Sequence, residues 1–344
     1  MKKLLNTLYV TKQNVYLSLK GETIALLEDD KTVLQLPLHN LESIVCFGYK
    51  GISPMLMGRC VEMGIHISFV SRSGRYLAGV AGETNGSVLV RREQYRISCE
   101  EGLRLGIARN IICAKLYNSY HFIDRTCREH PLQVDTERLR EASTGIKELL
   151  SSAKQCEDAA SLRGIEGAAA ERYFSVLNES VLQNKEDFCF GGRSRRPPLD
   201  RTNALLSFVY TLLASEYRSA ISSAGLDPFV GFLHADRAGR ASLALDLMEE
   251  LRSVVADRFV ISVINNRVIK PNMFTVRENG AVYLDDDGRR ALIAAWQERK
   301  QKTITHPFLD EKIEWGLVPY SQALLLSRYI RGDLDAYPPF FWRQ

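Results

Sequence analysis

Long apolar runs and a secretory leader are both missing from this sequence. No apolar stretch approaches the ~18 to 20 residues that a membrane-spanning helix needs. The opening segment, MKKLLNTLYVTKQN, has two lysines but neither a sustained apolar core nor a small-residue cleavage site. We therefore expect no membrane insertion and no secretion, and we expect the protein to be cytoplasmic.

Paired cysteine motifs are absent as well. The seven cysteines are widely scattered, their number is odd, and no two of them form a CxxC pair. This distribution argues against both a disulfide framework and a zinc knuckle. We expect most of these cysteines to lie in the core, as small apolar side chains in a reducing compartment.

A strong excess of either charge is also lacking, because 45 basic residues stand against 41 acidic ones and the net charge is +4. A DNA-binding surface would have to come from local clusters, since affinity follows local neutralisation of phosphates. A solvated loop is the alternative explanation of such runs. The candidates for phosphate contacts come from the segments GGRSRRPP and HADRAGR, and they are Arg193, Arg195, Arg196, Arg237 and Arg240.

Two kinds of periodicity divide the chain and predict an α+β fold with two domains. Residues 1–88 contain short apolar or alternating runs separated by polar turns, which is typical of a small strand-rich domain. One helix interrupts them, SPMLMGRCVEMG, with Ser53 as its N-cap and Pro54 in its first turn. Its expected buried stripe consists of Met55, Met57, Cys60 and Met63. The expected strands are LYVT, NVYLSL, TIALLE, TVLQLPL, SIVCFG, IHISFVS and YLAGVAG.

The remainder of the chain is expected to be helical. We assign residues 89–95 to a hinge and residues 96–344 to a larger all-α catalytic domain, because apolar residues recur there every three to four positions. The segment VRENGAVYLDDDG breaks this pattern, and its NG turn predicts a small hairpin. The stretch RRALIAAWQERKQKTI that follows is expected to be one helix. The chain closes with an extended aromatic-proline tail, YPPFFW, which either docks a partner or packs against its own domain.

Carboxylates and one histidine recur in two of these helical segments. Glu166 precedes a run of small alanines, and His234 follows the apolar run FVGFL. Asp246, Glu249 and Glu250 share one face of an otherwise apolar helix, where buried acids are costly without a partner. Two carboxylates and a histidine can hold a divalent cation and leave coordination positions open, as phosphodiester chemistry requires.

Each of these residues also has a plainer explanation. A glutamate in the first turn of a helix is favoured by the helix dipole, which would account for Glu166. His234 could be a hydrogen-bonded core residue, or it could transfer protons instead of binding metal. Arg252 and other basic residues could pair with the acids of the apolar helix in a purely structural ion network.

A further segment, PPLDRTNALLSFVYTLLASEYRSAI, predicts a long apolar helix whose start is bracketed by Asp200 and Asn203. A capped core helix explains most of its residues. Alternatively, Ser207 and two tyrosines on successive turns could line a phosphate groove. Tyr210 and Tyr217 are therefore further candidates for contacts with DNA.

Four segments taken together resemble one known family. They are IEGAAAERYF, PPLDRTNALLSFVYTLL, GLDPFVGFLH and SLALDLMEELR. They resemble the CRISPR-associated spacer-acquisition endonuclease/integrase family, the larger of the two universal adaptation proteins ("Cas-one"). The resemblance covers nearly the whole chain, and its order of a strand-rich module before a helical domain fits that family. The ending GDLDAYPPFFW is similar to the subgroup of type I-C systems.

The resemblance implies which residues bind the catalytic metal. In that family the ligands are a glutamate, a histidine and a further acid, which by motif position are Glu166, His234 and Glu249. Many relatives have aspartate at the last of these positions. Asp246 remains a candidate for a ligand or a supporting role, and the part played by Glu250 stays open. Oxygen-rich ligation with a single imidazole suits Mg²⁺ or Mn²⁺ better than zinc.

The implied activity is metal-dependent cleavage and joining of DNA. Such an integrase inserts DNA fragments into a CRISPR array when a 3′-hydroxyl attacks a phosphodiester at a repeat boundary. The implied partners are double-stranded DNA, a second copy of the chain bound through the strand-rich domain, and a small ferredoxin-like adaptation protein. The residues by themselves leave two alternatives: a non-catalytic DNA-binding assembly scaffold, and a helical metal hydrolase of a small substrate.

Overall fold

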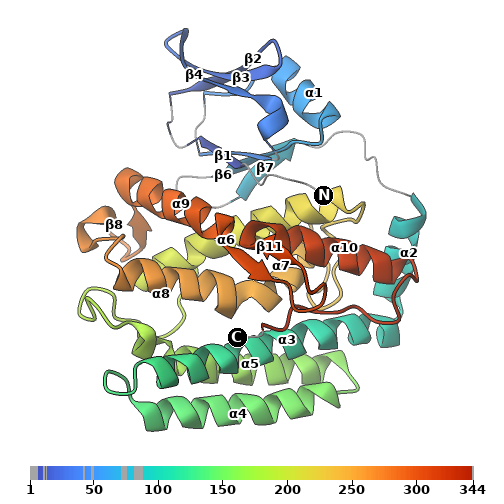
Figure 1. Cartoon of the computed structure of the whole chain (residues 1–344), viewed down its shortest axis with the longest axis vertical. Coiled ribbons are helices and arrows are strands. Elements are labelled where there is room, and N and C mark those ends of the chain that lie inside the picture. The colour runs from blue at the N-terminus through green and yellow to red at the C-terminus, as the bar shows by residue number, and fades with distance from the viewer. Residues whose placement is uncertain are drawn as a thin grey trace. The chain divides into compact units, whose positions relative to one another are not determined.

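A computed structural model describes residues 7–10, 12, 14–41, 43–47, 50–70, 76–80 and 88–342. The chain divides into two compact units, Met1–Asn85 and Gly86–Gln344 (Figure 1). The first is built on strands and the second on helices, which confirms the predicted fold class. None of the described helices combines the length and the apolar character needed to cross a bilayer.

The strand-rich unit contains two sheets. One is a four-stranded sheet in the order β1-β5-β6-β7, parallel except for its last pair, and the other is the antiparallel meander β2-β3-β4. All seven predicted strands are present, although some of their expected end residues and the turn between the last two lie outside the described residues. Their bounds are β1 Thr7–Val10, β2 Tyr16–Lys20, β3 Thr23–Glu28, β4 Lys31–Pro37, β5 Ser43–Cys46, β6 His66–Val70 and β7 Tyr76–Val80.

The single helix of this unit, α1 (Pro54–Glu62), begins as the sequence predicts. The Ser53 side chain accepts a hydrogen bond from the Leu56 backbone N–H at 3.2 Å, and Pro54 occupies the first turn. Most of the predicted buried stripe is confirmed, because Cys60 is buried and Met57 and Met63 pack half-buried against the core. Met55 is the exception: it is 73% exposed, and Leu56 is buried in its place. Leu56 and Cys60 join the apolar core made by the strands.

The second unit is organised around long helices. Residues 89–95, which we expected to be a hinge, are helical and belong to α2. Helices α3, α4 and α5 lie side by side, with the remaining helices packed beyond α3 (Figure 1). Aspartates cap four of the described helices, among them α6 through Asp200. The bounds are α2 Val88–Cys99, α3 Glu101–Glu129, α4 Thr136–Lys154, α5 Ala159–Val176, α6 Arg201–Ser223, α7 Ser242–Met248, α8 Arg258–Asn265, α9 Asp286–Gln301 and α10 Val318–Ile330.

Two small hairpins interrupt the helices. The predicted one is confirmed as β8 (Phe274–Val276) paired with β9 (Val282–Leu284), and Gly280 in its turn has a φ of 77°. The other, β10 (Thr303–Thr305) with β11 (Lys312–Glu314), was not predicted. Its first strand takes residues that we expected at the end of α9, so the second unit is not purely helical.

The aromatic-proline tail packs against its own unit. Tyr337 and Phe340 are 1% and 0% exposed, so of the two alternatives for this tail the described structure has the intramolecular one. Asn118 of α3 holds it by donating to the Phe340 carbonyl and accepting from the Trp342 backbone N–H. Five of the seven cysteines are buried and all seven are free, as predicted.

Candidate active site

The two neighbouring acids Glu249 and Glu250 lie where the helical path changes type. Helix α7 is followed by a 3₁₀ turn, η3 (Glu249–Leu251), and then by a π-helical turn, η4 (Arg252–Asp257). Such turns change the direction in which successive side chains point, and π turns are frequent at functional sites. Here they send the two glutamates to different partners.

Glu249 and Glu166 converge on the ammonium group of Lys115. Lys115 comes from α3 and Glu166 from α5, and the Lys115 Nζ contacts a carboxylate oxygen of each glutamate, at 2.7 Å in the case of Glu249. The side chains of Lys115 and Glu249 are 10% and 9% exposed. Three separate elements therefore place two carboxylates around one position for a positive charge.

Glu249 is also neutralised from its other side. The Arg252 guanidinium donates to both carboxylate oxygens of Glu249 at 2.9 Å. Burial raises the pKa of Glu249, but the charges of Arg252 and Lys115 outweigh it and lower this pKa to about 2. Glu249 is consequently ionised at neutral pH. The ion network that we considered as a structural alternative is thus present around this acid.

Asp246 orients His234. The His234 Nδ1 lies 2.6 Å from the Asp246 Oδ1, and the backbone N–H groups of Phe232, Leu233 and His234 all donate to the same carboxylate. Asp246 is 0% exposed, so its oxygens are committed to these four donors. A histidine that donates through Nδ1 keeps its lone pair on Nε2, which is the arrangement of a metal ligand with an outer-shell carboxylate. The hydrogen bonds of Asp246 thus place it behind His234, where it orients the ring.

A glycine makes this loop possible. A Cβ atom at Gly231 would lie 2.7 Å from the Asp246 Oδ2 and 2.8 Å from the Ser242 Cβ. Any larger residue would push the loop away from α7. The close approach lets the backbone after Gly231 wrap the Asp246 carboxylate and places His234 at its rim.

Glu250 points away from this cluster toward the C-terminal tail. Its carboxylate accepts hydrogen bonds from the Tyr337 hydroxyl at 2.6 Å, the Gln322 amide at 2.8 Å and the Phe340 backbone N–H at 2.9 Å. Glu250 is 0% exposed, and burial raises its pKa to about 7. Its neighbours make it an anchor of the tail and remove it from the candidate ligands.

The donor set has the composition of a site for a divalent cation, although the donors are not closed around one point. Among the described residues, no three His, Cys, Asp or Glu side chains lie close enough to enclose an ion. Glu166 and Glu249 nevertheless already share one cation, Lys115, and a protonated His234 would be close enough to lower the pKa of Glu249. Two carboxylate donors and an imidazole with an available Nε2 have the chemistry that Mg²⁺ or Mn²⁺ accepts.

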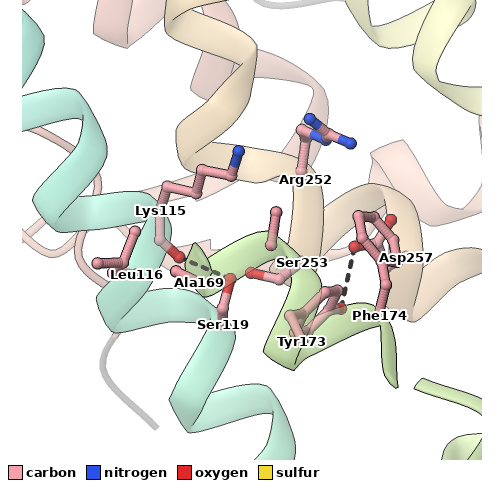
Figure 2. A pocket seen from close by; sticks show the side chains of 10 residues that line it. Lys115, Leu116, Ser119, Ala169, Tyr173, Phe174, Arg252, Ser253 and Asp257 are labelled. Atoms are coloured by element: carbon pink, nitrogen blue, oxygen red, sulfur yellow. Dashed lines mark hydrogen bonds between the residues drawn. The ribbon is translucent and has the colours of Figure 1, made fainter. Parts of the chain in front are cut away.

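A pocket adjoins the carboxylates on the side of α3 and α5. Figure 2 shows the Lys115 ammonium and the Arg252 guanidinium extending on the same side of it. On its floor the Tyr173 hydroxyl donates to Asp257 at 2.9 Å. The lining residues are Lys115, Leu116, Ser119, Ala169, Ala170, Tyr173, Phe174, Arg252, Ser253 and Asp257. The pocket therefore places two cationic groups and several small side chains beside the carboxylates.

Comparisons with known proteins identify the family. The family model of CRISPR associated protein Cas1 matches residues 8–298. A protein of Chlorobaculum tepidum named CRISPR-associated endonuclease Cas1 1 is 47% identical over 343 residues, which cover 100% of both chains. The chain belongs to the Cas1 family. This is the family that the four sequence segments resemble.

Solved structures share the Cas1 fold. A casposase bound to integration product matches with a TM-score of 0.83 at 22% identity, over 99% of this chain and 95% of that one. The chain from a Cas6-RT-Cas1–Cas2 complex matches with a TM-score of 0.83 at 23% identity, over 100% of this chain and 37% of that one. Both likenesses concern the fold.

The two tyrosines that we proposed as DNA contacts differ in burial and in their hydrogen bonds. Tyr217 is 0% exposed, so the proposed contact with DNA is wrong for this residue. Tyr210 is half-buried, donates its hydroxyl to Asp257, and packs its ring against the Arg252 guanidinium at 4.4 Å. It supports the arginine that neutralises Glu249. Periodicity could not separate the two tyrosines, because both lie on one helix.

The arginines that we proposed as phosphate contacts differ in exposure. Arg193 is half-buried and donates to the Asn203 side chain and the Ser207 hydroxyl, so it ties its loop to α6. Arg195 and Arg196 in the same loop are exposed. In the loop after His234, Arg237 is exposed and Arg240 is half-buried.

Sequence reasoning missed Lys115, Tyr173 and Asp257. Lys115 lies in the apolar run IICAKLYN, on the buried face of α3. A lysine at a core position of a helix requires a buried partner, and that signal could have identified it. Asp257 gave no comparable signal, because its two tyrosine partners are far away in the sequence.

Proposed function

We propose that this Cas1-family chain is a divalent-metal-dependent DNA endonuclease and integrase. Its reaction would be the insertion of a DNA fragment into a CRISPR array by attack of the fragment's 3′-hydroxyl on a repeat-boundary phosphodiester. With water as the nucleophile, the same site would cut DNA strands. The observation that carries this proposal is the convergence of Glu166 and Glu249, from two different elements, on one position for a positive charge.

The chain's own residues would divide the work. Glu166, Glu249 and the Nε2 of His234 would hold the Mg²⁺ or Mn²⁺, and Asp246 would keep the Nε2 lone pair available. A bound ion of this kind neutralises charge on the scissile phosphate and orients the attacking group. Arg252, which already extends into the adjoining pocket, would add a positive charge next to the phosphate.

Double-stranded DNA is the proposed substrate, both as incoming fragment and as repeat. The exposed Arg195, Arg196 and Arg237 are the proposed phosphate contacts, together with the half-buried Arg240. The structural neighbour described as a casposase bound to integration product supports this reading, since it is named for the same type of reaction.

The proposed assembly is a homodimer formed through the strand-rich unit, bound to a small ferredoxin-like adaptation protein. The neighbour taken from a Cas6-RT-Cas1–Cas2 complex supports a partner of this class. The ending GDLDAYPPFFW supports assignment to the type I-C-like subgroup. A CRISPR array and a gene for a small partner protein next to this gene would support both proposals.

The deciding experiment is strand cleavage and joining on branched and half-site repeat DNA, with Mn²⁺ or with EDTA. We expect Glu166→Gln, His234→Gln and Glu249→Gln to reduce the metal-dependent rate at least about 100-fold, because each removes a ligand of the metal ion that activates the scissile phosphate. Glu171→Gln is the matched control, since Glu171 is an exposed glutamate on the same helix α5.

The outcome separates the three candidate functions. A folded protein that binds DNA but shows no metal-dependent cleavage or joining would establish the scaffold, in which the acids form only an ion network. Metal-dependent turnover of small phosphorylated or peptide substrates, without any action on DNA, would establish the small-substrate hydrolase. Loss of DNA processing in the three variants but not in Glu171→Gln supports the integrase.

A further inference from the structure

A lysine occupies the position that the proposed function requires for a metal ion. Lys115 Nζ lies between the Glu166 and Glu249 carboxylates, and both contacts are within hydrogen-bond distance. Its stem is fixed on α3, where Lys115 is flanked by the buried Ala114 and Leu116. The ammonium is therefore held in the cluster by the packing of its own helix as well as by charge.

We propose that Lys115 is a built-in counter-cation, which fills the gap between Glu166 and Glu249 in the metal-free protein and must be displaced by the incoming divalent ion. This inference rests on the proposed function of the two carboxylates. An ammonium and a divalent ion cannot share one site between two carboxylates, since their like charges repel at contact distance.

The adjoining pocket gives the displaced side chain a place to go. Lys115 lines this pocket together with Arg252 (Figure 2). Rotation about its flexible four-carbon stem would move the ammonium without movement of α3. In that position its charge would lie beside the ion and face any phosphate that enters. Lys115 thus acts as a positioning residue: it keeps the carboxylates neutralised before the ion arrives and is free to meet the phosphate afterwards.

Without Lys115, Glu249 would keep a cationic partner and Glu166 would not. Glu249 keeps the bidentate contact with Arg252, whereas the Glu166 carboxylate has no other ion pair or side-chain hydrogen bond among the described residues. Removal of Lys115 therefore leaves a negative site that only an external cation can neutralise. Affinity for the ion should rise, although catalysis by the loaded enzyme need not.

Binding of Mn²⁺ to the full-length protein, followed by the EPR signal of free Mn²⁺, tests this inference without any turnover. We expect Lys115→Met to bind Mn²⁺ about tenfold more tightly than wild type, the effect of one lost competing charge-assisted contact. Lys115→Arg keeps the charge and should bind no more tightly than wild type. Lys300→Met is the matched control, because Lys300 is a buried lysine of α9 that pairs with Glu216 of α6 at 2.9 Å.

Glu166→Gln separates failure of this inference from failure of the proposed function. If Glu166→Gln weakens Mn²⁺ binding but Lys115→Met leaves it unchanged or weaker, the counter-cation role is overturned and the metal site stands. If Glu166→Gln has no effect on Mn²⁺ binding, the metal site itself fails, and the role of Lys115 fails with it.

A measurement on the wild-type protein covers the case in which Lys115→Met does not fold. Lysines are acylated with acetic anhydride at fixed pH, with and without Mg²⁺, and the modified peptides are quantified by mass spectrometry. We expect Mg²⁺ to increase the labelling of Lys115 several-fold, because the displaced amine becomes accessible, and to leave Lys300 unchanged. Equal labelling of Lys115 with and without saturating Mg²⁺ would overturn the proposal.

Discussion

The imidazole of His234 and the buried carboxylate of Asp246 are joined through Nδ1 and Oδ1 at 2.6 Å. Three backbone N–H groups from the loop that carries the histidine bind the same carboxylate, so one aspartate sets both the path of the loop and the proton position on the ring. A histidine that binds a metal ion commonly donates its other ring N–H to a carboxylate in this way. The dyad therefore links the fold of the α7 entry directly to the chemistry of the site.

Replacing Asp246 should reduce metal affinity and activity even in a variant that remains folded. In Asp246→Asn the amide would present N–H groups to backbone donors, and the histidine would no longer be held with its lone pair on Nε2. We expect Mn²⁺ affinity and strand-joining activity to fall about 10- to 100-fold. Isothermal titration with Mn²⁺ and a half-site integration assay measure these two effects.

Asp236→Asn is the control for this change, because Asp236 is exposed in the same loop. It should leave metal affinity and activity at wild-type levels. Wild-type Mn²⁺ affinity in a folded Asp246→Asn protein would show that the orientation of His234 does not matter for binding the ion.

Two tyrosines on α6 should respond in opposite ways to loss of their hydroxyl groups. Tyr217 is fully buried, and its hydroxyl finds no hydrogen-bond partner among the described residues. Tyr217→Phe should therefore be neutral or stabilising by about 1 kcal/mol, because it removes an unsatisfied polar group. Tyr210→Phe takes a donor from the buried Asp257 and should cost about 1–3 kcal/mol.

Urea unfolding followed by tryptophan fluorescence measures both variants. All three tryptophans, Trp296, Trp315 and Trp342, lie in the helical unit, so the signal reports the unit that contains both tyrosines. A Tyr217→Phe protein that is less stable by more than about 1 kcal/mol would mean that the hydroxyl has a partner after all.

Local signals in the sequence predicted the elements whose causes are local. The cap at Ser53, the proline that follows it and the Asn279-Gly280 turn each act within a few residues, and each is found where predicted. The hinge prediction failed because VLVRREQ combines apolar and charged residues at a spacing that α2 can use. The buried stripe of α1 failed only at Met55, because the neighbouring Leu56 is equally apolar and periodicity in a short helix does not choose between them.

The candidate site could be predicted only in part, because its contacts are tertiary and not local. Residue type and motif position singled out Glu166, His234 and Glu249, but their neutralising partners are set by tertiary contacts. Lys115 reaches Glu166 across 51 positions of sequence and belongs to a different helix. No periodicity encodes such a contact, and only the buried position of a lysine within α3 hints at it.

Arginines in one loop should separate into DNA-binding and structural roles. Arg195→Ala and Arg196→Ala should each weaken DNA binding and reduce the slope of log K against log salt concentration by about 1, since each exposed guanidinium would neutralise one phosphate. Arg193→Ala should instead destabilise the fold, because it removes hydrogen bonds to Asn203 and Ser207. Fluorescence anisotropy with labelled duplex DNA over a salt series checks the first expectation, and thermal unfolding checks the second.

An exposed arginine in the same unit provides the comparison. Arg290 on α9 is exposed, and Arg290→Ala should change neither the salt slope nor the melting temperature appreciably. Identical salt slopes for Arg195→Ala, Arg196→Ala and Arg290→Ala would remove the loop from the DNA-binding surface.

Acid should destabilise the helical unit through His306. This histidine is 0% exposed, its Nδ1 accepts from the backbone N–H groups of Phe308 and Leu309, and its Nε2 donates to the Gln322 side chain at 3.1 Å. Protonation of Nδ1 would place its N–H opposite the backbone N–H groups of Phe308 and Leu309, and both hydrogen bonds would be lost. Burial lowers the pKa of His306, which therefore lies below the unfolded value of about 6.5.

The sign of the pH effect follows from this lowered pKa. As the pH falls, His306 binds a proton in the unfolded chain at a higher pH than in the folded chain. The contribution of His306 to the free energy of unfolding is therefore complete above about pH 6.5 and is lost as the pH falls below this value. We expect the free energy of unfolding to decrease as the pH falls below about 6.5, with a slope of at most about 1.4 kcal/mol per pH unit from this group. Urea titrations at several pH values, read by tryptophan fluorescence, would give that slope.

His306→Gln cannot take up the proton and should reduce the slope of stability against pH. His39→Gln changes an exposed histidine of the strand-rich unit and should leave the slope unchanged. An unchanged slope in His306→Gln would place the acid sensitivity in other groups.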